Sequence, residues 1–318
     1  MTEEQVLDEG ADFEEHRRYL ASVAYRLLGS LADAEDAVQD AWLRWQSTDR
    51  SAVREPRAFL TTVVTRICYD QLGSARARRE AYYGEWLPEP VVAGAAGSAV
   101  ALGDATGRDP EELATLGESV SYAVLAVMEQ LSPAERVAFV LHDVFAVGFE
   151  EVAATLGRSP EAVRQLASRG RRRVKEHTAQ RTVDRAEHVK AVAAFTAATV
   201  HGDIPGLMAV LDPEVVWHSD GGGIVRAGVR PVIGADRVAR LVGGLAGKWA
   251  PPEFGVTYRQ VEVNGAAGVA ILDRDGAAMG VICFEVVDGR ITAAYAVVNP
   301  EKLERVAGGA VSPHLPRR

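Results

Sequence analysis

Residues 148–177, GFEEVAATLGRSPEAVRQLASRGRRRVKEH, gather side chains suited to binding nucleic acid, although the chain as a whole carries a formal net charge of −9. Guanidinium and ammonium groups that lie close together neutralise phosphates and release their counterions, which gives affinity for nucleic acid of any sequence. The basic residues near the end of this segment are Arg169, Arg171, Arg172, Arg173 and Lys175. Their clustering predicts a phosphate-binding surface.

The same segment divides into two helices around a turn. We expect one helix over 149–156 and a second from Pro160 to 177, with Gly157 supplying the permissive backbone between them. Two helices joined by a short turn containing glycine form a helix-turn-helix, whose second helix enters the major groove. Its early exposed residues meet base edges, and the arginines that follow suit phosphate. The residues predicted to contact DNA are Arg164, Gln165, Ser168, Arg169, Arg171 and Arg172.

Charge is segregated along the rest of the chain. Residues 1–40 hold eleven Asp and Glu against three Arg, whereas residues 54–79 hold six Arg against Glu55 and Asp70. Alternating acidic and basic blocks indicate one surface for a basic protein partner and others for phosphate. Solvated helix faces would give the same alternation, so charge by itself leaves both readings open.

The pattern of elements predicts a multidomain chain, because 318 residues exceed what one compact core usually holds. Apolar residues recur at helical spacing through 13–79 and 111–177, and Ala and Gly dominate 91–107 between them. From 185 onward one helix precedes runs rich in Val, Ile, Tyr and Phe, and Val287-Asp288-Gly289-Arg290 predicts a hairpin. The expected divisions are a helical bundle over 12–80, a flexible linker over 81–110, a helix-turn-helix domain over 111–178, an α+β domain over 185–307 and a tail over 308–318.

Several classes of protein are disfavoured by composition. No apolar run reaches about 18 residues, and the acidic start lacks the layout of a signal peptide. Cys68 and Cys283 lie far apart and match no disulfide or metal spacing, so we expect a reducing cytoplasm, no metal and no cofactor.

The N-terminal motifs carry a resemblance to a known family. DAEDAVQDAWLRWQ (33–46), REPRAFLTTVVTRICYDQL (54–72) and the helix-turn-helix follow one another in the order found in extracytoplasmic-function sigma factors. These are the small promoter-specificity subunits of bacterial RNA polymerase, and the resemblance covers about residues 12–178. It implies two all-α modules that direct core polymerase to the −10 and −35 elements of promoters.

The resemblance also implies roles for individual residues. In the family, the acidic second helix binds the clamp helices of the polymerase, and here the matching residues are Asp36, Gln39, Asp40 and Trp42. The next helix and the loop before it open the −10 element and capture an unpaired base, a role matched here by Arg54, Arg57, Thr61, Thr62, Arg66 and Tyr69. Basic and aromatic residues suit single-stranded DNA. Arg66 departs from the asparagine that many members carry.

The remaining residues resemble a SnoaL-like domain, a cone of curved sheet with helices around a pocket. WLPEP (86–90), DGGG (220–223) and NPEKL (299–303) resemble motifs of the SigJ-like group of sigma factors, which carry this extension. In that group the appended domain regulates the sigma core in place of a separate anti-sigma protein. The resemblance implies intramolecular contacts through Trp86, Pro88, Asp220, Gly221, Gly222, Gly223, Asn299, Pro300, Lys302 and Leu303.

Catalysis by this domain is the weaker alternative. Trp217, His218, Tyr258 and Tyr295 are candidate pocket residues. Strand alternation separates Trp217 and Ser219 from His218 and Asp220, so the two ionisable groups share a face as a dyad or as an inert hydrogen bond. A lone pair of this kind is thin support for an enzyme, and we expect none. A small-molecule ligand, an isomerase or hydrolase fused to a DNA-binding region, and a stand-alone helix-turn-helix regulator stay open as alternatives.

Overall fold

The computed structural model describes residues 3–80, 82–93, 120–177, 184–249, 255–306 and 310–315. The chain forms two compact units. Unit 1 comprises 1–80, 99–120 and 127–177, and unit 2 comprises 81–98, 121–126 and 178–318. Segments on both sides of the connection between the helical modules therefore belong to unit 2.

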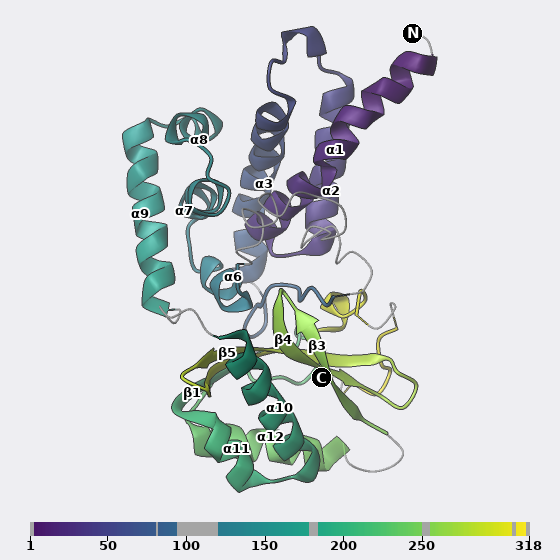
Figure 1. Ribbon diagram of the computed structural model, residues 1–318, viewed down its shortest axis with the longest axis vertical. Helices are drawn as coiled ribbons and strands as arrows, with labels where there is room; N and C mark the ends of the chain where they lie inside the picture. The colour runs from purple at the N-terminus through teal and green to yellow at the C-terminus, as the bar shows by residue number, and fades with distance from the viewer. Residues whose placement is uncertain are drawn as a thin grey trace. The chain divides into compact units, whose positions relative to one another are not determined.

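The first part of unit 1 is a three-helix bundle of α1 (Glu3–Leu28), α2 (Leu31–Gln46) and α3 (Pro56–Glu80), with a short 3₁₀ turn, η1 (Arg50–Ala52), before α3. The three helices pack against one another (Figure 1). Large apolar side chains such as Phe13, Leu27 and Trp45 fill the space between them and are almost completely buried. The all-α fold expected for this part of the chain is confirmed.

The second part of unit 1 is the helix-turn-helix. α7 (Pro133–Phe139) continues into the π turn η2 (Val140–Val144), and α8 (Phe149–Leu156) and α9 (Pro160–His177) follow. Ser132 and Glu135 form a capping box at the start of α7. Gly157 ends α8 in the left-handed region with φ of 62°, as the turn requires. The predicted boundaries of both helices are confirmed.

Unit 2 contains a six-stranded sheet in the order β2-β1-β6-β5-β4-β3. The strands are β1 (Leu211–Asp220), β2 (Val232–Ile233), β3 (Thr257–Val263), β4 (Ala266–Leu272), β5 (Ala278–Val287) and β6 (Arg290–Val297). β1 and β6 run parallel, and the other neighbours are antiparallel. Asp288 and Gly289 both have positive φ in the turn between β5 and β6, which confirms the predicted hairpin.

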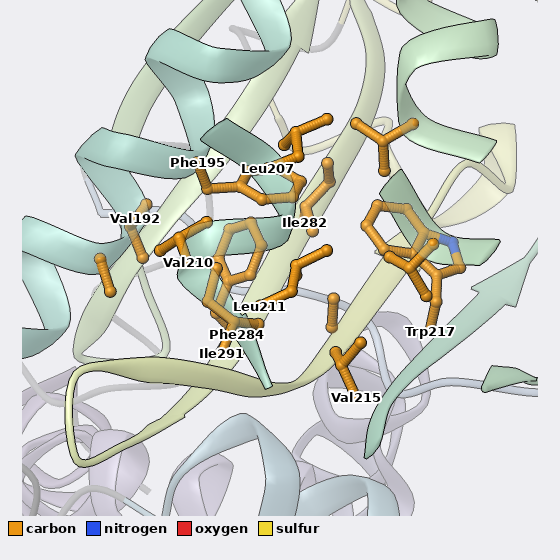
Figure 2. Close-up of a cluster of buried hydrophobic side chains, with 14 of the residues drawn as sticks. Val192, Phe195, Leu207, Val210, Leu211, Val215, Trp217, Ile282, Phe284 and Ile291 are labelled. Atoms are coloured by element: carbon orange, nitrogen blue, oxygen red, sulfur yellow. The ribbon is translucent and has the colours of Figure 1, made fainter. Parts of the chain in front are cut away.

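The two faces of this sheet are covered by different parts of the chain. Helices α10 (Arg185–His201), α11 (Ile204–Val210) and α12 (Ala235–Trp249) cover one face, where Phe195, Trp217 and Phe284 belong to one buried cluster (Figures 1 and 2). A second cluster joins the sheet to residues 87–92, to the start of α6 (Tyr122–Met128) and to residues beyond 300. The α+β fold expected for the C-terminal part of the chain is confirmed, with additional segments packed on the second face of the sheet.

The expectation of a flexible linker over 81–110 does not hold for residues 82–93, which we call the docked segment. Val92 forms a β-bridge with Val263, the Ala93 amide donates to the Glu262 carbonyl at 2.8 Å, and residues 87–92 are buried. Apolar and proline residues placed before the Ala- and Gly-rich stretch explain the difference, because they have surface to bury. The remaining linker, from 94 onward, and the start of the helical stretch expected from 111 lie outside the described residues.

The left-handed backbone at Gly157 can be tested by comparing alanine substitutions at two glycines that both have open space around them. No atom lies within 4 Å of a Cβ built on Gly157 or on Gly73, but only Gly157 has positive φ. We expect Gly157→Ala to lower the free energy of unfolding of unit 1 by about 1 kcal/mol through left-handed strain. Gly73→Ala, inside α3, should raise it by roughly the same amount. Urea denaturation followed by circular dichroism measures the free energy of unfolding of both variants. If both substitutions raised it, or both lowered it, the left-handed turn at Gly157 would be contradicted.

Candidate functional site

The exposed face of α9 carries the residues predicted to read DNA. Val163, Leu166 and Ala167 are buried against the rest of unit 1, and a Cβ added at Gly170 would lie 3.1 Å from the Phe139 Cβ. This close packing fixes which side of α9 faces solvent. The side chains that are exposed or half-buried on that side are Arg164, Gln165, Ser168, Arg169, Arg171 and Arg172.

Carboxylates of the same unit pair with these arginines. Arg164 lies 3.4 Å from Glu150, Arg169 lies 3.0 Å from Glu135, and Arg171 contacts Asp143. The Arg164 and Arg169 side chains are about half exposed, and exposed ion pairs contribute little to stability. A DNA phosphate could therefore replace Glu150 at small cost, whereas the Glu135 and Asp143 side chains are only 17% and 18% exposed.

The predicted −10 residues divide by exposure along α3 and the loop before it. Arg54, Arg57 and Arg66 are exposed, and Thr62 and Tyr69 are half-buried. Thr61 is 5% exposed and its hydroxyl donates to the Arg57 carbonyl at 2.7 Å, which removes it from the candidate DNA-contacting set. A helical threonine that bonds back to the preceding turn and faces the bundle is a structural residue.

Two of these arginines have partners within unit 1. The Arg57 guanidinium lies 4.1 Å from the centroid of the Tyr19 ring, and Arg66 donates to the Ala154 carbonyl in α8 at 3.0 Å. A cation held over an aromatic ring is oriented without losing its charge. Arg66 must leave α8 before it can contact a base.

One face of α2 presents the predicted polymerase contacts. Asp36, Gln39 and Asp40 are exposed at the i, i+3 and i+4 positions. Leu43 continues the same face and is 54% exposed, a residue that the sequence reasoning missed. Trp42 is half-buried against Phe13, with ring centroids 5.0 Å apart, so it mainly supports the helix. The face thus combines exposed carboxylates with one exposed apolar side chain.

The DGGG, WLPEP and NPEKL motifs meet at one carboxylate on the second face of the sheet in unit 2. Asp220 has no exposed surface. It accepts hydrogen bonds from the Tyr82 hydroxyl at 2.6 Å and from the amides of Leu87 at 2.9 Å and Gly222 at 3.0 Å. Burial and the adjacent carboxylate raise the pKa of Tyr82. The tyrosine therefore stays a neutral donor.

Lys302 supplies the countercharge. Its ammonium lies 2.7 Å from the Asp220 carboxylate, donates to the Leu87 carbonyl and lies 3.8 Å from the centroid of the Trp86 ring. The side chain is 10% exposed. A buried charge is tolerated only when it is paired and hydrogen-bonded, so this pair depends on the docked segment for part of its solvation.

The glycines after Asp220 allow the chain to approach closely. Gly222 has φ of 68°, and a Cβ there would lie 2.5 Å from the Asn299 Cγ. Asn299 in turn donates to the Tyr82 hydroxyl at 3.0 Å and caps the 3₁₀ turn η3 (Pro300–Lys302). Gly221 is as confined, since a Cβ there would lie 2.4 Å from the Val225 carbonyl oxygen, whereas a Cβ at Gly223 would lie 3.3 Å from the Tyr83 Cβ, a tight contact only.

Pro88 and Leu303 complete the motif contacts. The Pro88 carbonyl accepts a hydrogen bond from the Tyr122 hydroxyl, and Leu303 is completely buried in the same cluster. All ten residues expected to make regulatory contacts therefore lie at or beside the junction between the docked segment and the sheet.

Two further contacts at this junction were missed from the sequence. The Glu85 carboxylate accepts from the His218 Nδ1 at 2.8 Å and from the Ser219 amide at 3.3 Å. The Asn264 side chain accepts from the Val91 amide at 3.0 Å. The one sequence signal for Glu85 is its position directly before WLPEP. Asn264 carries no such signal, because an asparagine before a glycine is typical of an ordinary turn.

The domain also contains a cavity of about 360 Å³, lined mainly by apolar side chains. Trp217 and Tyr258 line it, but His218 and Tyr295 do not, which corrects the set of candidate pocket residues. His218 stacks on Tyr295 with ring centroids 5.0 Å apart on the opposite face of the sheet. The register pairs His218 with Tyr295 across β1 and β6, and alternation sends both side chains away from the cavity.

His218 and Asp220 do share a face, yet they bond to Glu85 and Lys302 and not to each other. Both are engaged by the junction, so they form no dyad in the cavity. Within the described ranges, no cluster of three or more His, Cys, Asp or Glu could hold a metal ion. Cys68 and Cys283 are buried free thiols, and no helix among the described residues is long and apolar enough to span a bilayer.

Known proteins resemble this chain along almost its whole length. Residues 13–78 match the family Sigma-70 region 2, and residues 121–174 match Sigma-70, region 4. The ECF RNA polymerase sigma factor SigJ of Mycobacterium tuberculosis is 42% identical over 301 residues, which cover 92% of this chain and 93% of that protein. The probable ECF RNA polymerase sigma factor SigI of the same species is 34% identical over 289 residues, covering 91% and 92%.

A solved structure agrees. The crystal structure of M. tuberculosis SigJ matches with a TM-score of 0.71 at 42% identity and covers 92% of this chain and 97% of that one. The helical modules, the sheet-containing domain and the motif contacts thus occur in a chain that belongs to the extracytoplasmic-function (ECF) sigma factors.

Proposed function

We propose that this sigma factor directs core RNA polymerase to promoters through three surfaces of unit 1 and is regulated through its docked segment. The face of α2 binds the polymerase, α3 and the preceding loop contact the −10 element, and α9 reads the −35 element. The chain acts by binding and not by catalysis, because His218 and Asp220 serve the junction. The name of the SigJ relative describes the same activity.

The observation that carries the regulatory part is the buried Asp220–Lys302 pair, which closes around the docked segment. This segment begins two residues after α3 ends, and Tyr122, at the other end of the connection, packs on Tyr295 of the same sheet. The C-terminal domain (184–315) therefore holds both ends of the connection between the −10 and −35 modules. A connection held in this way restricts how far apart the modules can move.

The α9 assignment separates base reading from phosphate binding. We expect Arg164→Ala to reduce the ratio of affinities for the cognate and altered −35 duplexes by about tenfold, the loss typical of one bidentate base contact. Arg172→Ala should weaken binding to every duplex alike and reduce the slope of log K against log salt by about one. Fluorescence anisotropy of the holoenzyme at several salt concentrations measures both. If both variants changed affinity and salt dependence in the same way, the division between base reading by Arg164 and phosphate binding by Arg172 would be refuted.

The α2 assignment predicts a loss of polymerase affinity on charge reversal. Asp36→Lys combined with Asp40→Lys should weaken binding to core polymerase by about tenfold or more, because like charges would then meet on a basic partner. Asp275→Lys reverses an exposed charge in unit 2 and serves as the control. Competition against labelled wild-type protein gives the affinity of each variant for core polymerase. If the double variant and the Asp275→Lys control lost affinity equally, this face of α2 would be excluded as the polymerase-binding surface.

The docked segment should be released when its countercharge is removed. Lys302→Met leaves the buried Asp220 carboxylate without a cation, a change that typically costs about 3–5 kcal/mol. Hydrogen exchange at the Leu87 and Ala93 amides should accelerate, and transcription should tolerate promoters whose spacer between the elements is one base pair longer or shorter. The control is Lys248→Met, which removes an exposed lysine that also lies over a tryptophan ring. Unchanged exchange and unchanged spacer preference in Lys302→Met would exclude this mode of regulation.

A further inference from the structure

The cavity of the C-terminal domain lies between the sheet and helices α10 and α12. Its volume of about 360 Å³ falls within the range of small-molecule sites. Aromatic rings from four elements line it: Phe195, Trp217, Tyr258 and Trp249. Figure 2 shows Phe195 and Trp217 in the layer between helices and sheet. Walls built from apolar and aromatic side chains favour a ligand with an apolar body, because binding removes apolar surface from water.

The polar groups of the cavity are few and differ in role. The Trp217 indole donates to the Ser219 hydroxyl at 3.0 Å, which leaves the hydroxyl proton free to point elsewhere. Burial raises the pKa of Tyr258, so its hydroxyl is neutral. Among the described residues that line the cavity, Arg226 is the only charged one. The lining thus offers three neutral hydroxyls, of which that of Thr199 already donates to the Phe195 carbonyl at 2.8 Å, and a single cation.

Arg226 is exposed and makes no ion pair with any carboxylate in the described part of the chain. An arginine at the edge of an apolar cavity presents a planar fork that binds a carboxylate through two hydrogen bonds. The lining holds no carboxylate that would attract a ligand cation. The charge and the apolar walls together select for a molecule with a flat apolar body and one acidic end.

We propose that this cavity binds an apolar monocarboxylic acid, with the carboxylate on Arg226 and the apolar body between Trp217 and Tyr258. The proposal rests on the proposed function, because it supplies that regulatory domain with a chemical class of effector. It adds a specificity-determining residue, Arg226, which lies outside the three motifs that hold the docked segment.

The cavity and the junction share strand β1. Trp217 and Ser219 face the cavity, while the alternate residues His218 and Asp220 hold the docked segment on the other side. The C-terminal tail also reaches the cavity through Leu315, and it is tied to β5 by hydrogen bonds between Ser312 or Ala310 and Ala278. A ligand that moves β1 or displaces Leu315 would therefore act on the elements that position the docked segment.

The test compares an acid with its neutral counterpart on the full-length protein. Isothermal titration calorimetry with 2-naphthoate and with 2-naphthamide should show tighter binding of the acid. Arg226→Gln should weaken the acid about tenfold, the equivalent of 1.4 kcal/mol, and leave the amide unchanged. Arg230→Gln removes an exposed arginine nearby that does not line the cavity, and it should change neither affinity.

Three results would overturn the proposal: absence of binding by both compounds, equal affinity for both, or equal losses in the two arginine variants. Promoter-directed transcription by the Arg226→Gln holoenzyme without ligand should equal that of the wild type. That measurement separates the proposed ligand from the proposed sigma function. Normal transcription together with failed binding of the acid would reject only the ligand. Failed transcription by the wild-type holoenzyme would reject the sigma function itself.

Discussion

The Asp220 carboxylate is completely buried, and its negative charge constrains the surrounding structure. Its partners come from three stretches that are remote in sequence: the docked segment through Tyr82 and Leu87, the glycine loop through Gly222, and the NPEKL turn through Lys302. Loss of any one of them leaves part of a charge unsolvated in the interior. The three stretches are therefore held together around one charge, and the docked segment depends on all of them for its place on the sheet.

Strand β1 gives this arrangement its two sides. Because side chains alternate across a sheet, consecutive residues of one strand serve unlike environments, an apolar cavity through Trp217 and a polar junction through His218. A domain of this architecture can hold a protein segment and enclose a small molecule without competition for the same residues. Under the proposed binding of an acid in the cavity, β1 would be the element through which the two sites are coupled.

The net charge of −9 conceals how the charges are used. In unit 1 the arginines of α9 pair with carboxylates of the same unit, and the pair between Arg164 and Glu150 is exposed on both sides and so contributes little to stability. On α2 the carboxylates are left exposed beside Leu43, which suits a protein partner. Opposite charges are thus distributed over separate helices, as the two binding surfaces proposed for unit 1 require.

Local sequence determined the elements whose signals are local: the Gly157 turn, the Ser132 capping box, the Asp288-Gly289 hairpin and the alternation that sets Trp217 apart from His218. It also indicated that the three motifs of the connection and the C-terminal domain belong together. Tertiary structure alone decided that Thr61 is buried, that His218 bonds to Glu85 and that Leu315 reaches the cavity. Periodicity reveals which face of an element is apolar but not which distant segment covers it, because that choice depends on packing between parts of the chain far apart in sequence.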